Sequence, residues 1–180
     1  MKLEQPRVPP LDESDWTPEQ IEVIGRQTMR GNVPNVFKTL IHHEKLAKRW
    51  LVFATHILSK NSMSPREREI AILRTGWLAG SDYEWGQHVI IGQDAGLTPD
   101  EIEAIKTGAD ATNWSHHERL ILRACDELHK DVFISDEVWE GLTETYSTEQ
   151  MMDLIFTCGQ YRMLAGALNS LGVPLDEDIR

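Results

Sequence analysis

The chain has 180 residues, of which 41% are hydrophobic, and its 29 acidic and 18 basic side chains give a net charge of −11. A chain of this length can bury one good core but would divide poorly into two, so we expect a single domain. No basic run is present that could follow a phosphate backbone or an anionic bilayer, and no segment approaches the roughly 20 apolar residues of a membrane span. We therefore expect a cytoplasmic protein whose partners are neither nucleic acids nor membranes.

The N-terminal segment differs in composition from the rest of the chain. Residues 1–16 are polar and include Pro6, Pro9 and Pro10, and proline lacks the backbone N–H that a helix interior needs. We predict an extended arm over 1–16 that lies on a neighbouring surface, followed by one helical domain over 17–180.

Five segments carry a helix-start pattern, in which Ser or Thr is followed three residues later by Glu or Gln. They begin at Thr17, Ser64, Thr98, Ser115 and Ser147. The residues that follow repeat apolar positions every three or four residues, which is the helical period, and no stretch alternates as a β-strand would. The sequence therefore predicts an all-α fold, with helices over 18–30, 35–59 with a break, 65–79, 82–95, 99–107, 115–130, 135–146 and 148–170.

The two cysteines lie inside these apolar patterns. Cys125 and Cys158 are far apart in the sequence, and two such residues fit buried thiols in a reducing compartment better than a disulfide framework. We interpret both as core residues.

The helix predicted over 82–95 carries a histidine on its apolar face. Trp85, His88, Val89 and Gly92 fall at i, i+3, i+4 and i+7, so they share the stripe that faces the core. A buried imidazole needs a hydrogen-bond partner, and Glu84, one turn earlier, can hold one ring nitrogen while the other is free for acid–base catalysis. The alternative is a core histidine that a structural partner satisfies.

The preceding helix adds an acid and an arginine beside its buried stripe. Glu69 and Arg74 flank Ile70 and Leu73 closely enough to reach inward. Glu69 could donate or relay a proton, and Arg74 could hold a substrate carboxylate through its planar guanidinium. An ordinary ion pair is the alternative for both residues.

Three consecutive motifs resemble the carboxymuconolactone decarboxylase family: residues 65–74, 83–88 and 95–102. The resemblance is strongest over 44–108 and extends more weakly to Gln160 and Tyr161 in the last helix. It implies an alkylhydroperoxidase-like helical bundle that assembles as a homotrimer or a hexamer.

The resemblance places this chain between two chemistries of the family. Glu69 and His88 match the proton-relay Glu and the His of the alkylhydroperoxidase branch, but the positions of its Cys-x-x-Cys pair hold Ser81 and Glu84. Neither residue can replace a thiolate in a redox cycle, so we do not expect thiol peroxidase activity. Ser81 and Glu84 also have the spacing of a capping box, so Glu84 serves either the helix end or the chemistry.

The decarboxylase branch is closer in chemical type. It implies a cofactor-free lyase or isomerase of aromatic-compound catabolism that acts on a small unsaturated carboxylic acid or carboxylated lactone. We assign proton delivery to His88 or Glu69 with support from Glu84, and substrate contacts to Arg74, Tyr83 and Ser81.

Other site types find no support in the sequence. Glycine-rich phosphate loops are absent, and the histidine pairs lack a third ligand for a metal, so we expect no cofactor. The alternative to an enzyme is a non-catalytic, oligomeric member of the family that binds a ligand.

Overall fold

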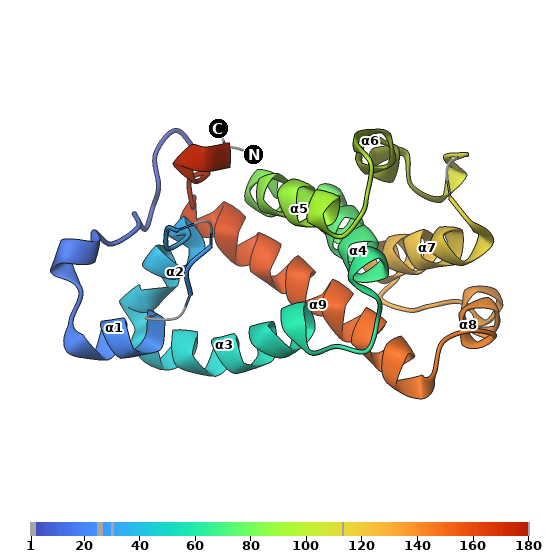
Figure 1. The fold of residues 1–180 in the computed structure, drawn as a ribbon, viewed down its shortest axis with the longest axis horizontal. Coiled ribbons are helices and arrows are strands. Elements are labelled where there is room, and N and C mark those ends of the chain that lie inside the picture. Colours follow the sequence, from blue (N-terminus) through green and yellow to red (C-terminus); the bar gives the residue numbers. More distant parts are fainter. Residues whose placement is uncertain (1–2, 25–26, 30, 113, 180) are drawn as a thin grey trace. The chain divides into compact units, whose positions relative to one another are not determined.

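The computed structural model describes residues 3–24, 27–29, 31–112 and 114–179, and in these ranges every regular element is helical apart from one isolated bridge between Met29 and Asn32. The predicted all-α fold is confirmed (Figure 1). The α-helices are α1 (Pro18–Ile24), α2 (Asn35–Leu40), α3 (Glu44–Ser59), α4 (Pro65–Leu78), α5 (Asp82–Asp94), α6 (Pro99–Thr107), α7 (His116–Lys130), α8 (Asp136–Thr143) and α9 (Thr148–Leu171). Short 3-10 helices are η1 (Glu13–Asp15), η2 (Ile41–His43), η3 (Gly108–Asp110) and η4 (Glu177–Ile179).

The helices form two compact units. One contains the described residues up to Ser59 together with those from Ala167 onward, and the other contains Lys60–Gly166. The boundary near the C-terminus therefore falls within α9.

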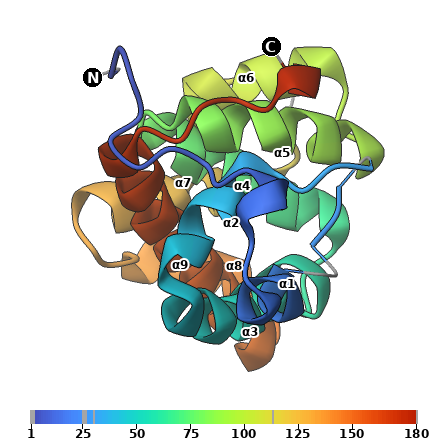
Figure 2. The same cartoon turned by 90° about the vertical axis from the view of Figure 1, so that its left-hand side faces the viewer.

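In the first unit, α1 lies beside α3 and α2 joins them through η2 (Figure 2). Ile24, Val33, Ile41 and Ala47 form its buried centre. The 3-10 turn η2 interrupts the helix between α2 and α3, which confirms the predicted break in 35–59. The segment before η1 has no regular structure, and the N–H groups of Arg7 and Val8 donate to the carbonyl of Leu171.

The first helix is shorter than predicted. We expected it to reach residue 30, but α1 ends at Ile24 and residues 27–29 are not helical; residues 25, 26 and 30 lie outside the described part. Met29 and Asn32 instead exchange two backbone hydrogen bonds, with Gly31 between them at a φ of 85°. Glycine adopts this left-handed conformation without the strain that a Cβ would add.

In the second unit, α4 is the central element. It packs against α5, α6 and α7, and α7 in turn packs against α8. Every residue of α4 from Glu69 to Gly76 is buried. The first half of α9 completes the core through Met151, Leu154 and Cys158.

All five predicted helix starts are confirmed, because α1, α4, α6, α7 and α9 begin one residue after the Ser or Thr of each pattern. Three of these starts are full capping boxes in which the hydroxyl and the glutamate exchange bonds with the backbone: Ser64 with Glu67, Thr98 with Glu101, and Ser115 with Glu118.

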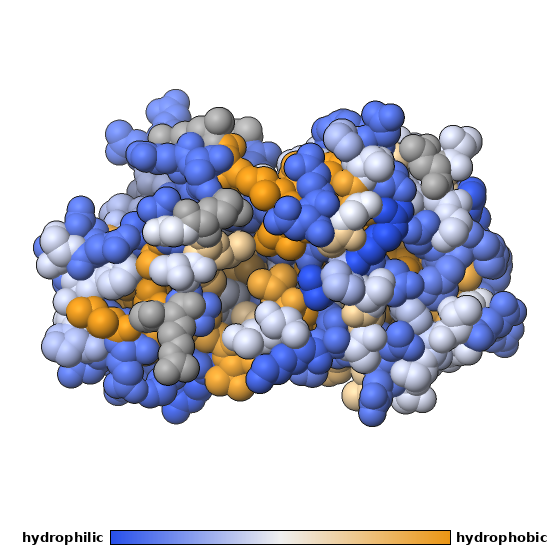
Figure 3. Space-filling model, in the orientation of Figure 1, coloured by the Kyte–Doolittle hydropathy of each residue, from blue (hydrophilic) through white to orange (hydrophobic). Residues whose placement is uncertain are grey.

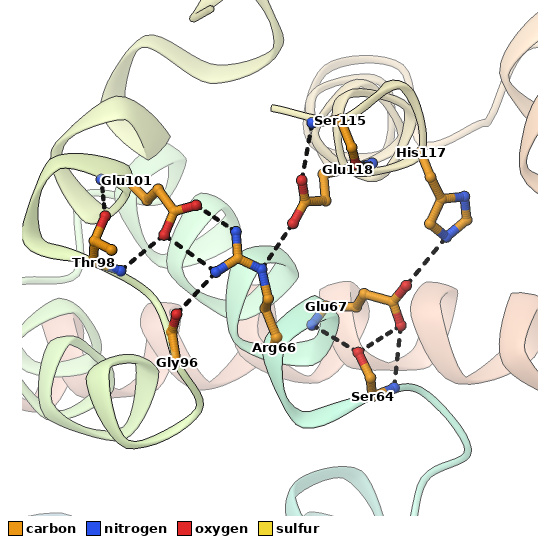
Figure 4. A network of polar contacts seen from close by, with 9 residues as sticks. All are labelled: Ser64, Arg66, Glu67, Gly96, Thr98, Glu101, Ser115, His117 and Glu118. Carbon is orange, nitrogen blue, oxygen red and sulfur yellow. Dashed lines mark hydrogen bonds and ion pairs between the residues drawn. The ribbon is translucent and has the colours of Figure 1, made fainter. Parts of the chain in front are cut away.

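A single arginine joins these three capped ends (Figure 4). Arg66, on the first turn of α4, forms ion pairs with Glu101 of α6 and Glu118 of α7, and it also donates to the carbonyl of Gly96. The contact with Glu101 holds the pKa of that carboxyl down at about 2. We refer to Arg66, Glu101 and Glu118 as the Arg66 cluster.

The surface is largely hydrophilic on the face drawn in Figure 3, with hydrophobic side chains among the polar ones. Val52, Phe133 and Phe156 are examples of large apolar residues that stay exposed. None of the helices in the described ranges is long and apolar enough to cross a membrane.

Candidate active site

Helices α4 and α5 form an antiparallel pair whose close approach depends on two glycines. A Cβ on Gly76 would lie 3.4 Å from the Cβ of Glu84, and a Cβ on Gly92 would lie 3.2 Å from Leu73. Gly76 of α4 lies against the start of α5, and Gly92 of α5 lies against the middle of α4. These two contacts set how the two helices are aligned along their length. This register brings the polar residues in the middle of both helices to the same interface.

At this interface Glu69 and His88 meet directly. Glu69 Oε2 lies 2.6 Å from His88 Nδ1, and both side chains are buried, with 0% and 8% of their surface exposed. The other carboxylate oxygen of Glu69 accepts from Arg68 Nε at 3.1 Å. Both oxygens of Glu69 are thus engaged, and the carboxylate is fixed between a guanidinium and an imidazole.

His88 keeps one ring nitrogen available. Nδ1 bonds to Glu69, whereas Nε2 makes no hydrogen bond to any residue that the structure describes. Because Nδ1 is taken up by the contact with Glu69, Nε2 is the nitrogen left for proton exchange. Tyr161 of α9 packs edge-on against the imidazole, with ring centroids 4.9 Å apart, and this contact helps fix the orientation of the ring.

Glu84 is buried without a charged partner. Its side chain lies one turn before His88, and neither carboxyl oxygen forms a hydrogen bond in the described part of the chain. Burial raises the pKa of Glu84 to about 8, an effect that the nearby Ser81 hydroxyl reduces only in part. At neutral pH this carboxyl is therefore mostly protonated, so that it can donate a hydrogen bond.

Neither role that the sequence suggests for the Glu84 carboxyl is seen. His88 Nδ1 takes Glu69 as its partner, although Glu84 lies at the helical spacing. The capping pattern is half present, because the Glu84 N–H donates to Ser81 Oγ at 3.4 Å but the carboxyl does not return a bond to the backbone.

Ser81 and Tyr83 are both buried at the start of α5. Ser81 is the N-cap of the helix. The Tyr83 hydroxyl accepts from Gln87 Nε2 at 3.4 Å. Ser81, Glu84 and His88 fall at i, i+3 and i+7 and so share the face of α5 on which His88 meets Glu69, whereas Tyr83 lies on another face of the helix.

Arg74 lies apart from this group in its contacts. Its Nε donates to Asp126 at 2.6 Å, and Nη1 donates to the carbonyls of Ile105 and Lys106 at the end of α6. A Cβ on Gly108 would lie 2.6 Å from the guanidinium. Arg74 therefore closes the C-terminal end of α6 and holds α7, which is the ion-pair alternative considered above.

Two residues of the site were not selected from the sequence. Arg68 could have been noticed as the neighbour of Glu69, but Tyr161 reaches His88 from a distant helix and no local pattern connects them. Within the described ranges, no group of three or more His, Cys, Asp and Glu side chains is placed to hold a metal ion.

Comparison with known proteins agrees with this architecture. Residues 44–127 match the model of the carboxymuconolactone decarboxylase family. This segment contains α4, α5 and both members of the Glu69–His88 pair. The match confirms, over this segment, the resemblance to that family predicted from the sequence. No curated protein sequence matches the chain significantly.

Several solved structures share the fold over nearly the whole chain. A peroxidase-related protein from Ralstonia eutropha JMP134, described as an alkylhydroperoxidase AhpD core, has a TM-score of 0.85 at 17% identity, covering 97% of this chain and 94% of its own. A variant of the debrominase Bmp8 in complex with 2,3,4-tribromopyrrole has a TM-score of 0.81 at 16% identity, with coverage of 97% and 94%. A peroxidase-related protein from Silicibacter sp. TM1040 has a TM-score of 0.79 at 16% identity, with coverage of 98% and 92%. The predicted alkylhydroperoxidase-like fold is confirmed.

Proposed function

We propose that this protein is a cofactor-free acid–base enzyme, a decarboxylase or other lyase or an isomerase, that acts on a small unsaturated carboxylic acid or carboxylated lactone. The observation that carries the proposal is the buried 2.6 Å contact between Glu69 and His88, with His88 Nε2 left unbonded in the described part of the chain. A carboxylate that orients an imidazole and leaves its second nitrogen free is a common arrangement for general acid–base catalysis.

In a decarboxylation, the bond between the substrate carboxylate and the ring carbon breaks, and carbon dioxide leaves. The electron pair of that bond delocalises into the unsaturated carbonyl system as a dienolate, which must then take up a proton at carbon. His88 Nε2–H delivers this proton, and Glu69 stabilises the imidazolium from which it comes. Solvent then returns a proton to His88. In an isomerisation the same nitrogen removes a proton from one carbon and returns it to another.

Glu84 supplies the second element of the mechanism. A carboxyl that remains protonated at neutral pH can donate a hydrogen bond to the carbonyl oxygen on which negative charge develops. Its raised pKa of about 8 and its unbonded oxygens support this role. Tyr83 and Ser81 are the neighbouring polar contacts for the substrate, whereas we leave Arg74 out of the chemistry because Asp126 and the end of α6 hold it.

The comparisons support the proposal at a coarser level. The family takes its name from a decarboxylase, and one protein with the same fold was crystallised with a small unsaturated ring, tribromopyrrole. The same resemblance leads us to propose a homotrimer or hexamer of this chain, which light scattering after size-exclusion chromatography would test.

The experiment is a screen of purified protein, with no cofactor added, against a panel of unsaturated carboxylated lactones and acids, followed by loss of ultraviolet absorbance. With a substrate found, we expect His88→Ala and Glu69→Gln each to lower kcat by about 100- to 10,000-fold. His116→Ala, a change at an exposed histidine on the first turn of α7, is the matched control and should stay at the wild-type rate.

Two results would contradict the proposal. Turnover that persists in His88→Ala would remove the histidine from the chemistry. Saturable binding of panel members without any turnover would instead favour the alternative, a non-catalytic family member that binds a ligand. Circular dichroism of each variant separates these results from simple loss of the fold.

A further inference from the structure

The two cysteines of the chain are in contact. Cys125 lies on α7 and Cys158 on α9, and their Sγ atoms are 3.6 Å apart. Both are free thiols, and both are buried, with 1% and 4% of their surface exposed. The sequence places them far apart and led us to interpret each as a separate core residue, so their contact is a product of the tertiary fold.

The surroundings make the two sulfurs chemically unequal. Cys125 lies 3.8 Å from the carbonyl of Ala71 on α4, to which its S–H can donate. The contact with Cys158 and burial raise the pKa of Cys125. The hydrogen bond between the two sulfurs lowers the pKa of Cys158 against the opposing effect of burial, and the Thr75 hydroxyl lowers it further. Cys158 is therefore the more acidic sulfur and also the more exposed of the two.

We propose that Cys125 and Cys158 form a dithiol that a hydroperoxide oxidises to an intramolecular disulfide joining α7 to α9. This modification goes beyond the acid–base function proposed above and does not depend on it. It also lies outside α5, where Ser81 and Glu84 replace the thiols of the peroxidase relatives.

The reaction balances in two steps. The Cys158 sulfur attacks the outer oxygen of the peroxide, the O–O bond breaks, and the thiol proton leaves with the alcohol or water, so that a sulfenic acid forms. The Cys125 sulfur then attacks the sulfenic sulfur, the S–O bond breaks, and water leaves with the remaining thiol proton. Two thiols are oxidised and one peroxide is reduced. The sulfurs need to approach from 3.6 Å to the bonding distance of about 2.05 Å.

The disulfide would close a loop that contains α8 and the first half of α9. Closing a loop of this length removes conformational freedom from the unfolded chain. Because Tyr161 lies one turn after Cys158 and packs against His88, the crosslink would also fix the helix that supports the candidate site. We expect the oxidised protein to unfold at a temperature several degrees above that of the reduced protein.

The test is to treat the full, reduced chain with increasing hydrogen peroxide and to map the products by mass spectrometry without reduction. Trypsin cuts after Arg123, Lys130 and Arg162. The proposal predicts that peptides 124–130 and 131–162 appear as one species, lighter by two hydrogens than their sum. Dithiothreitol should separate them, and the protein should stay free of crosslinks between chains.

Cys125→Ser is the matched control, since it keeps Cys158 but removes its partner. In this variant Cys158 should advance to sulfinic acid, whereas in the wild type the disulfide protects it. Equal sulfinic acid at Cys158 in both proteins, or both wild-type thiols remaining unmodified, would overturn the proposal. If Cys125→Ser does not fold, the crosslinked peptide of the wild type alone decides the result.

Discussion

Helix α4 carries two polar clusters that use their hydrogen-bonding atoms in opposite ways. In the Arg66 cluster at its first turn, the oxygens of Glu101 and Glu118 all have partners, from the guanidinium or from a backbone N–H (Figure 4). In the site around Glu69, His88 leaves Nε2 unbonded and Glu84 leaves both oxygens unbonded in the described part of the chain.

The difference indicates what each cluster is for. A polar group whose bonds are all made can stabilise the fold, whereas a buried polar group without a partner destabilises it. The Arg66 cluster therefore serves the structure by tying together the starts of three helices. The bonding capacity left unused around Glu84 and His88 lowers stability, and in the proposed function it is what the substrate would engage.

Among the variants of these clusters, Arg66→Met should have the largest effect on stability. It leaves the carboxylates of Glu101 and Glu118 without their shared cation, and we expect a loss of about 2–3 kcal/mol in the free energy of unfolding. Urea titration followed by circular dichroism measures it. A loss under about 0.5 kcal/mol, the range of a surface ion pair, would mean that the cluster does not hold the helices together.

The Arg66 cluster should also make the protein sensitive to acid. The hydrogen bond from Arg66 lowers the pKa of the Glu101 carboxyl to about 2 in the folded protein, from 4.5 in the unfolded chain. As pH falls, the unfolded state therefore binds the Glu101 proton first. The stabilisation that ionised Glu101 gives the fold is complete above about pH 4.5 and is lost towards about pH 2. Arg66→Met should flatten that part of the stability profile. An unchanged profile would assign the acid sensitivity to other carboxyls.

Ser115→Ala tests one of the three caps alone. It removes the hydroxyl that accepts from the Glu118 N–H at the start of α7, and we expect a loss of about 1 kcal/mol. The same urea titration measures it. A loss as large as that of Arg66→Met would show that the cap, and not the arginine, positions Glu118.

Arg123→Met should have the smallest effect. Its ion pair with Glu137 is long, at 3.7 Å, and both side chains are exposed. We expect a change within about 0.5 kcal/mol. As a matched arginine-to-methionine change on the neighbouring helix, it shows how much of the Arg66→Met effect comes from the cluster itself.

Much of the fold follows from local sequence signals. The capping patterns at Ser64, Thr98 and Ser115 placed helix starts to the residue, because a cap is formed within four consecutive residues. The end of α1 was wrong, because the turn at Gly31 competes with the continuing helix and the apolar period does not reveal it.

The site was predictable only in part. His88 and Glu69 were identified from the buried faces of their helices and from the family resemblance, and they do meet. Tyr161 and the contact between Cys125 and Cys158 were not, because α9 approaches α5 and α7 only through tertiary packing. Glu84 shows a further limit: its spacing allows a bond to His88, but the choice between two carboxylates depends on how α4 and α5 cross.

The stability of Glu84→Met from about pH 5 to about pH 9 tests whether Glu84 is a protonated, buried carboxyl that lowers the stability of the fold. Between 4.5 and about 8 the unfolded state loses its Glu84 proton while the folded state keeps it, so the wild type loses stability as pH rises and the variant does not. We predict that Glu84→Met is more stable than the wild type by about 1–3 kcal/mol at neutral pH, with a margin that grows with pH. A variant less stable than the wild type, with no such pH trend, would mean that Glu84 stabilises the fold and would contradict its assignment as a protonated carboxyl without a charged partner.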